Sequence, residues 1–180
     1  MCPMLSPGCA NNGEDEVNPL SALLDTSFLI SLADANRSSH AAAHEYYRYF
    51  VSEGGTLLLP TIVVAEFAVK QPIDALPLHN FRILPFNLPH ALLCAELNVA
   101  ANRAATGLVG QRDAVKDDFK IIAQAQVEQA SFLLTDDAET MGTYCSRLAA
   151  DGKTAFKVVL LRDGFDIAFV NGTGQTELPV

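Results

Sequence analysis

Carboxylate residues follow two apolar segments of this 180-residue chain, at positions where parallel strands deliver side chains to a common edge. Asp25 comes directly after the apolar residues 21–24, and Asp136 and Asp137 follow residues 131–134 with Thr135 between. In an open α/β sheet, ligands bind beyond the carboxyl ends of the strands, beside the N-termini of the following helices. The spacing therefore predicts an acidic site at one edge of a parallel sheet, of the kind that binds a metal ion.

Asp25 stands between a predicted strand and a predicted helix that begins near Phe28. One interpretation is a helix cap, because Asp, Thr and Ser all accept hydrogen bonds from free N–H groups at a helix start. Thr26 or Ser27 can fill that role equally well, which leaves Asp25 as a carboxylate at the strand end. Ser27 is then an auxiliary residue of the same site.

Glu66 interrupts an apolar helical segment, residues 61–70, that follows the predicted strand 56–59. By the i, i+3, i+4, i+7 rule its face is otherwise apolar, and we expect this face to pack on the sheet. The other members of the face are Ile62, Ala65 and Val69. A buried carboxylate must be paired, protonated or bound to a cation. An ion pair with Arg82 or Arg103 is the alternative, but metal binding is favoured because Glu66 lies about two turns beyond a strand end.

The helix predicted over residues 114–130 carries two adjacent acids whose faces differ. The face of Asp118 continues through apolar residues: Ile121, Ile122 and Ala125. The face of Asp117 continues mainly through polar ones: Lys120, Gln124 and Glu128. We therefore expect Asp118 to point toward the sheet as a ligand, and Asp117 to point toward solvent.

The second acidic pair follows the predicted strand 131–134. Asp136 with Glu139 has the spacing of a capping box, which gives Asp136 a structural role and leaves Asp137 to face the site. The roles of these two acids can also be exchanged. Thr135 either hydrogen-bonds a ligand or caps the turn, and Thr135 and Asp136 are therefore kept as auxiliary residues.

Four carboxylates from four segments converge in the predicted fold: Asp25, Glu66, Asp118 and Asp137. Hard oxygen ligands without a thiolate or an evident imidazole select Mg²⁺ or Mn²⁺ over zinc. Such a cluster can activate water as hydroxide and stabilise the charge that develops on a phosphate. Other kinds of site lack their motifs, since the sequence contains no G-x-x-x-x-G-K-[ST], G-x-G-x-x-G, G-x-S-x-G or C-x-x-C.

The composition is that of a globular domain, with 49% apolar and 18% charged residues. No apolar run is long enough to cross a membrane and no secretory signal opens the chain, so we expect a cytoplasmic protein without a membrane partner. The net charge of −9 argues against a broad basic surface for duplex DNA. It does not exclude nucleic-acid chemistry, because a carboxylate-bound cation itself contacts the phosphate.

We expect residues 1–19 to form a disordered tail, residues 20–172 a single domain and residues 173–180 a loose tail. Residue patterns also predict helices over 40–52, 88–105 and 138–150 and strands over 81–86 and 155–161. The Asp-Gly pair at 163–164 is typical of a hairpin turn, which predicts a partner strand over residues 166–170.

Four segments of the sequence, taken in order, resemble the four acidic motifs of PIN-domain nucleases. They are LLDTSFLI, PTIVVAEFAV, DDFKIIAQA and FLLTDD, and together they span about residues 22–140. The resemblance implies that Asp25, Glu66, Asp118 and Asp137 are the catalytic, metal-binding acids. It also implies a three-layer α/β/α sandwich with a central, mostly parallel β-sheet, to which the residue pattern adds a C-terminal β-hairpin. The implied activity is Mg²⁺- or Mn²⁺-dependent cleavage of an RNA substrate, often by a homodimer.

Within that family, the size and the single-domain build resemble the VapC-type toxins of toxin–antitoxin pairs. This resemblance implies a small antitoxin protein as partner, whose C-terminal segment covers the site. The acidic N-terminal tail and the hairpin after residue 155 are additions to a minimal toxin, and basic residues near the site are few. The nearest in sequence are Arg112, Lys116 and Lys120, which either steer an RNA phosphate or decorate a solvated helix face.

Two other functions fit the same acids. A non-catalytic binding module would hold a cation or a basic peptide in an acidic pocket, which the net charge of −9 favours. A phosphohydrolase acting on small substrates would use the same carboxylate cluster and the same metal ion.

Overall fold

The computed structural model describes residues 20–97 and 112–172 of the chain. The tails expected over 1–19 and 173–180 lie outside the described residues, as does the second half of the helix expected over 88–105. Within the described ranges strands and helices alternate, which is the order that an α/β protein requires.

Five strands form one sheet in the order β3-β2-β1-β4-β5. Their bounds are Ser21–Leu24 (β1), Thr56–Pro60 (β2), Phe81–Leu84 (β3), Phe132–Thr135 (β4) and Lys157–Leu160 (β5). Every pair of neighbouring strands is parallel. Parallel sheets are covered on both faces, which explains why β1, β2 and β4 are runs of apolar residues without polar alternation. The predicted α/β class and the central parallel sheet are confirmed.

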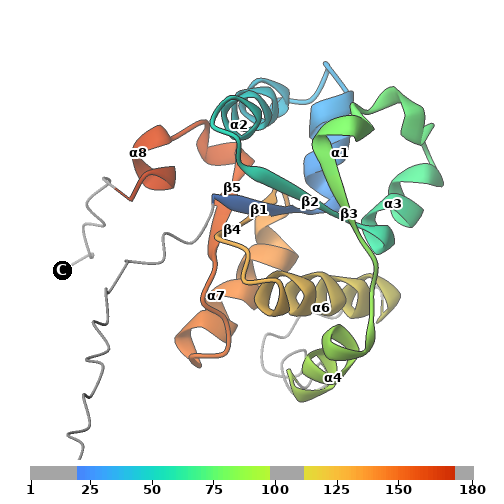
Figure 1. The fold of residues 1–180 in the computed structure, drawn as a ribbon, viewed down its shortest axis with the longest axis vertical. Coiled ribbons are helices and arrows are strands. Elements are labelled where there is room, and N and C mark those ends of the chain that lie inside the picture. The colour runs from blue at the N-terminus through green and yellow to red at the C-terminus, as the bar shows by residue number, and fades with distance from the viewer. Residues whose placement is uncertain (1–19, 98–111, 173–180) are drawn as a thin grey trace, which may run out of the picture.

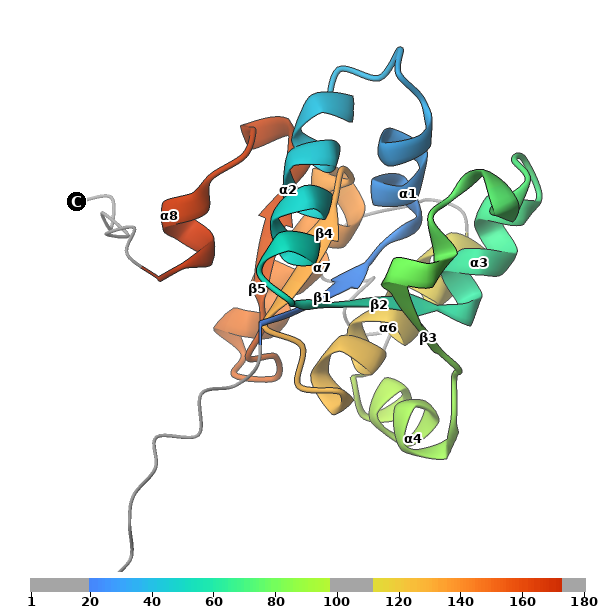
Figure 2. The ribbon, with the colours of Figure 1, turned by 45° about the horizontal axis from the view of Figure 1, so that its top comes forward.

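Helices cover both faces of the sheet, so the domain has three layers (Figure 1). One face carries α1 (Thr26–Ala33) and α2 (His40–Ser52), with α3 (Thr61–Ala68) beside α1. The other carries α6 (Arg112–Val127) and α7 (Thr143–Ala150), with α4 (Leu88–Glu96) against α6 (Figure 2). Shorter elements are the 3₁₀ turns Ile73–Ala75, Leu78–Asn80 and Leu161–Asp163, the π turn Ala138–Gly142 and the helix α8 (Ile167–Val170). No helix in the described ranges is long and apolar enough to cross a membrane.

The buried face of α6 anchors the helix that carries Asp118. Phe119, Ile122 and Ala125 of this helix are inaccessible to solvent and belong to the central core. Fully burying an aliphatic or aromatic side chain stabilises a protein by roughly 1.5–3 kcal/mol. The apolar periodicity of α6 thus holds its polar N-terminal half in a fixed position over the sheet.

The pairing register brings the ends of β1 and β4 level with each other. Leu24 pairs with Leu134, and the N–H of Asp25 donates to the carbonyl of Leu134 at 3.1 Å. Leu23 pairs with Leu58 of β2, so β2 ends at the same edge. The residues that follow these three strands therefore share one edge of the sheet, as the sequence predicts.

The predicted C-terminal β-hairpin is wrong. After β5 the chain forms a 3₁₀ turn and then the helix α8, where a returning strand was expected. Gly164 does turn the chain, with a φ of 84°, but Asp166 then caps α8 by accepting from the N–H of Phe169 at 3.0 Å. The helix cap made by Asp166 thus decides the structure of this segment, and the Asp-Gly turn does not lead into a strand.

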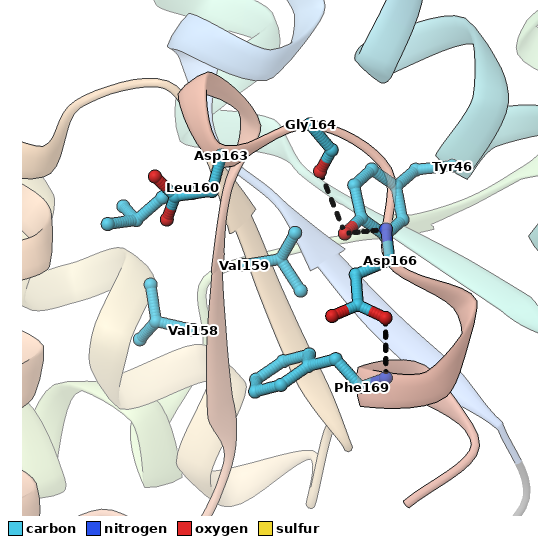
Figure 3. Close-up of a pocket in the computed structure, with 8 residues that line it drawn as sticks. All are labelled: Tyr46, Val158, Val159, Leu160, Asp163, Gly164, Asp166 and Phe169. Atoms are coloured by element: carbon cyan, nitrogen blue, oxygen red, sulfur yellow. Dashed lines mark hydrogen bonds between the residues drawn. The ribbon is translucent and has the colours of Figure 1, made fainter. Parts of the chain in front are cut away.

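Tyr46 of α2 holds the connection between β5 and α8. Its hydroxyl donates to the carbonyl of Gly164 at 3.2 Å and accepts from the N–H of Asp166 at 3.1 Å (Figure 3). Phe169 packs toward Phe132 of β4, with ring centroids 6.2 Å apart. Tyr46, Asp166 and Phe169 line a small cavity of about 170 Å³ together with β5, so α8 packs against the sheet and does not extend it.

Replacing Tyr46 by Phe removes the hydroxyl that holds this connection. We expect the free energy of unfolding to fall by about 1–2 kcal/mol, because two backbone groups lose their partner. Tyr144 provides a matched control: it is fully buried, and its hydroxyl has no hydrogen-bond partner within the described part of the chain. Tyr144→Phe should be neutral or stabilising. Urea denaturation of both variants measures the difference, and equal effects would contradict the role of Tyr46.

Candidate functional site

Asp25 is buried at the start of α1, with 5% of the residue exposed. Its Oδ2 accepts from the backbone N–H of Ser27 at 3.4 Å, so Asp25 itself caps the helix, although Thr26 or Ser27 was expected in that role. Shorter hydrogen bonds reach the same oxygen from the hydroxyls of Ser27 (2.6 Å) and Thr135 (2.7 Å). Burial raises the pKa of the Asp25 carboxyl, and these hydrogen bonds partly oppose the rise.

The hydroxyls of Ser27 and Thr135 connect Asp25 to the turn after β4. Ser27 Oγ accepts from the N–H of Asp136 at 2.7 Å, and Thr135 Oγ1 accepts from the N–H of Asp137 at 3.0 Å. Each hydroxyl has a single hydrogen, which it donates to Asp25. Thr135 therefore caps the turn and positions the Asp25 carboxylate at the same time, and it is fully buried.

Glu66 reaches this edge from α3, but not through the face that the sequence predicts. The buried residues of α3 are Val63 and Phe67, whereas Val69 of the expected stripe is 82% exposed. The predicted facing is wrong because α3 is apolar on nearly every side, so its periodicity does not distinguish one face. Glu66 is instead oriented by α1, since Thr26 Oγ1 donates a hydrogen bond to its carboxylate.

The charge environment of Glu66 is acidic. Burial raises the pKa of its carboxyl, the Thr26 hydrogen bond lowers it, and the charges of Asp117 and Asp25 raise it further. The alternative of an ion pair with Arg82 is not what the structure shows, because Arg82 pairs with Glu128 at 3.1 Å. Arg103, the other arginine considered, lies outside the described residues.

Asp118 lies where the four acids meet. Burial raises the pKa of its carboxyl to about 8, and the negative charges of the other acids contribute to this rise. In order of size they are Asp25, Asp137, Glu66 and Asp117. The structure therefore brings the other three acids predicted from separate segments within electrostatic range of Asp118.

Asp117 was expected to point toward solvent, but its side chain is only partly exposed and lies within electrostatic range of the acids. Its Oδ1 accepts from Nζ of Lys120 at 2.6 Å, with the Asp117 side chain 28% exposed. Its charge raises the pKa of both Glu66 and Asp118, so it is a fifth carboxylate near the site. Helical facing missed it because Asp117 stands at the boundary between the two faces of α6.

Asp137 and not Asp136 caps the helical segment after β4. Its Oδ1 accepts from the N–H of Thr140 at 2.9 Å, so the predicted capping box of Asp136 with Glu139 is wrong. Asp137 nevertheless lies among the acids, because its charge raises the pKa of Asp118. The segment begins as a π turn, a form that often occurs at functional sites.

Asp136 turns toward α1 and α2. Its Oδ2 accepts from the hydroxyls of Ser39 at 2.6 Å and Ser31 at 3.2 Å, and both serines are buried. Ser39 occupies the N-cap position of α2 without making a cap bond, because its hydroxyl is used by Asp136. Asp136 therefore ties the end of β4 to the helices above it.

The donor set fits a hard divalent cation by its chemistry. Carboxylates that raise one another's pKa repel, and a bound cation relieves that repulsion. As the side chains stand, no three His, Cys, Asp or Glu residues of the described ranges are arranged to hold a metal ion. Cys145 is buried near Asp25 and Asp118, but burial raises the pKa of its thiol, so it is not a thiolate ligand.

A cleft of about 770 Å³ between α1 and α3 opens beside Glu66. It is lined by Thr26, Ile30, Arg37, Glu66, Phe67, Val69, Lys70 and Gln71. Arg37 belongs to the turn between α1 and α2, and Lys70 follows α3. The sequence gives no sign that these two cations lie together, because only the packing of α1 on α3 brings them to one cleft.

Comparison with known proteins identifies the fold. No family model matches the sequence, and no curated protein matches it. Among solved structures, a chain of VapBC2 from Rickettsia felis matches with a TM-score of 0.53 and 16% sequence identity. The match covers 78% of this chain and 98% of that one, and that structure is bound to a DNA fragment from the VapBC2 promoter. A chain of DNA-bound VapBC from Salmonella typhimurium matches with a TM-score of 0.52 and 13% identity over 79% and 98%.

The three-layer sheet with acids at its carboxyl edge places this chain in the α/β class with a PIN-like fold. The matched chains come from VapBC structures, and this chain shares their fold. At 13–16% identity this likeness establishes the fold and leaves the activity to the chemistry of the site.

Asp118 should make the stability of the metal-free protein depend on pH. Folding raises the pKa of this carboxyl from 3.8 to about 8, so the folded protein retains a proton that the unfolded chain releases above about pH 4. The free energy of unfolding should therefore fall as the pH rises from about 4 to about 8, and level off above that. The slope from this group is at most about 1.4 kcal/mol per pH unit.

Urea denaturation in the presence of a chelator, between about pH 5 and 9, measures this slope. Asp118→Asn removes the titrating group and should flatten the curve. Equal slopes in the wild type and in the variant would contradict the assigned proton.

Proposed function

We propose that this protein is a metal-dependent endoribonuclease whose catalytic acids are Asp25, Glu66, Asp118 and Asp137. One observation supports the proposal: the carboxylates of Asp25, Glu66 and Asp137 lie within electrostatic range of Asp118 at the carboxyl edge of a parallel sheet. Their proximity is expressed in the raised pKa of Asp118, to which the other three charges contribute. A stable protein keeps such a cluster only where a cation or protons balance it.

Each acid has a residue that orients it. Ser27 and Thr135 position Asp25, and Thr26 positions Glu66. The side chain of Asp137 is held by its bond to the N–H of Thr140. Asp118 is placed by the neighbouring Phe119, which is fully buried. These acids would together hold Mg²⁺ or Mn²⁺, the ions that carboxylate oxygens favour.

When bound, such a cation lowers the pKa of water and stabilises the negative charge that develops on a phosphate. The protein's own residues hold the acids in place. In the metal-free protein the Asp118 carboxyl, with a pKa of about 8, retains a proton that a bound cation would displace. No side chain of the described ranges is required as a nucleophile, since water attacks the phosphodiester.

A toxin–antitoxin pair is the setting we propose for this activity. The support is the fold, because the matched chains come from VapBC complexes of Rickettsia felis and Salmonella typhimurium. A small antitoxin protein would then be the partner of this chain. The homodimer that the resemblance implies stays a prediction.

Asp25→Asn and Asp118→Asn should each reduce Mn²⁺-dependent cleavage of an RNA pool by about a hundredfold or more, because each removes a charge that holds the cation. Asp151→Asn is the matched control, since Asp151 is an exposed carboxylate at the end of α7, away from the acids. Circular dichroism and thermal melting verify that the variants fold.

Three other results separate the alternatives. Full cleavage by both site variants would contradict the assignment. Cleavage of small phosphate esters without cleavage of RNA would favour the phosphohydrolase. Tight binding of a cation or a basic peptide, with neither substrate hydrolysed, would favour the binding module.

Asp137→Asn and Asp136→Ala should have different effects. Asparagine still caps a helix, so Asp137→Asn should keep the fold and lose cleavage through loss of charge. Asp136→Ala leaves the buried hydroxyls of Ser31 and Ser39 without their carboxylate and should cost about 1–3 kcal/mol of stability. Calorimetry with Mn²⁺ completes the comparison: a larger loss of affinity in Asp136→Ala than in Asp137→Asn would reverse the assignment.

A further inference from the structure

The cleft beside Glu66 combines features that the proposed catalytic acids do not use. Arg37 follows α1 and Lys70 follows α3, and both residues line the cleft. Glu66 and Thr26 belong both to the cleft wall and to the acidic edge. The cleft is therefore continuous with the candidate site.

Both cations of the cleft are available to a ligand. Arg37 and Lys70 are exposed, and neither forms an ion pair within the described part of the chain. Asp34, the acid nearest to Arg37 in sequence, accepts hydrogen bonds from Asn36 at 3.0 and 3.1 Å. Lys120, by contrast, is occupied by Asp117. In a chain with a net charge of −9, two unpaired cations at one cleft are a local exception.

The rest of the wall suits an unpaired nucleotide strand. Ile30, Phe67 and Val69 give apolar surface, and Thr26 and Gln71 add hydrogen-bonding groups. Proteins that bind single strands combine cations that follow the phosphates with surfaces that accept bases. A peptide would also contact the apolar wall. Arg37 and Lys70 form no ion pair within the described ranges and outnumber Glu66, the acid that shares the cleft wall with them, so the cleft complements a polyanion better.

We propose that this cleft binds the RNA strand on one side of the cleaved bond, with Arg37 and Lys70 each contacting a phosphate. The inference rests on the proposed function and adds a path for the substrate. A strand in the cleft leads past Glu66 to the acids, so these cations position the strand and take no part in the chemistry. Neutralising them should weaken RNA binding and leave cation binding unchanged.

The test compares two double variants in an Asp118→Asn background, in which a bound strand is not cut. Arg37→Gln with Lys70→Gln removes the cleft cations. Arg48→Gln with Lys153→Gln removes an exposed arginine and an exposed lysine elsewhere and changes the net charge equally. Binding of a fluorescent single-stranded RNA is measured as a function of salt concentration.

Loss of two phosphate contacts should reduce the slope of log affinity against log salt by about 1.4 and lower the affinity about tenfold at low salt. The control pair should retain the slope of the Asp118→Asn parent. Mn²⁺ affinity, measured by calorimetry in the wild-type background, should be the same with and without the cleft cations. The substituted side chains are exposed, so thermal melting should verify that both pairs fold.

Equal salt slopes in both double variants would overturn the inference, and Mn²⁺-dependent cleavage by the wild type would then still support the proposed function. If the wild type does not cleave RNA, the proposed function and the substrate path fail together. If the cleft variant retains RNA binding but loses a copurifying protein, the cleft belongs to a protein partner and the inference is wrong.

Discussion

Repulsion among carboxylates held at one edge of a parallel sheet is the constraint on which the rest of this structure depends. A carboxyl that is partly buried and surrounded by like charges retains its proton near neutral pH in the metal-free protein, as Asp118 does with a pKa of about 8. Such a group is tolerated because the elements that carry it are fixed by other interactions. The strands β1 and β4, which precede Asp25 and Asp137, are paired on both sides, and Phe119 anchors α6 in the core next to Asp118. The acids cannot move apart without disturbing a closely packed interior.

Hydroxyl groups and not cations orient these acids. Ser27 and Thr135 donate to Asp25, and Thr26 donates to Glu66. A hydroxyl fixes a carboxylate and leaves its negative charge in place, whereas an arginine or lysine at the same position would neutralise it. The charge of Lys120 lowers the pKa of Glu66, but Lys120 is bound to Asp117. Asp25 and Glu66 are thus oriented without an ion pair, which leaves their oxygens available to a metal ion.

The sequence predicts the strands, their parallel pairing and the acids that follow them, because each of these depends on local patterns. The face of α6 is also predictable, since apolar residues mark one side of it. Predictions failed where a local signal was ambiguous or where a contact joins distant segments. The all-apolar α3 gave no usable periodicity, so Glu66 reaches the site through Thr26 and not through the predicted stripe. Asp137 caps the helical segment in place of Asp136, because Asp136 accepts hydrogen bonds from Ser31 and Ser39, about a hundred residues earlier in the chain. After β5 the helix α8, capped by Asp166, forms in place of the predicted hairpin.

An acidic protein that acts on RNA must solve a further electrostatic problem. At physiological ionic strength charges are screened beyond about 8 Å, so the net charge of −9 matters less to a bound strand than the groups that it touches. In the proposed function these groups are Arg37 and Lys70 at the cleft and a cation at the acids. Glu66 belongs to both places, and its negative charge opposes a phosphate in the cleft until a cation compensates it. Cation and strand should therefore bind cooperatively, and by thermodynamic linkage each should raise the affinity of the other by the same factor. Under the proposed function, the protein would bind an RNA strand weakly without its metal ion and more tightly once the cation occupies the acids.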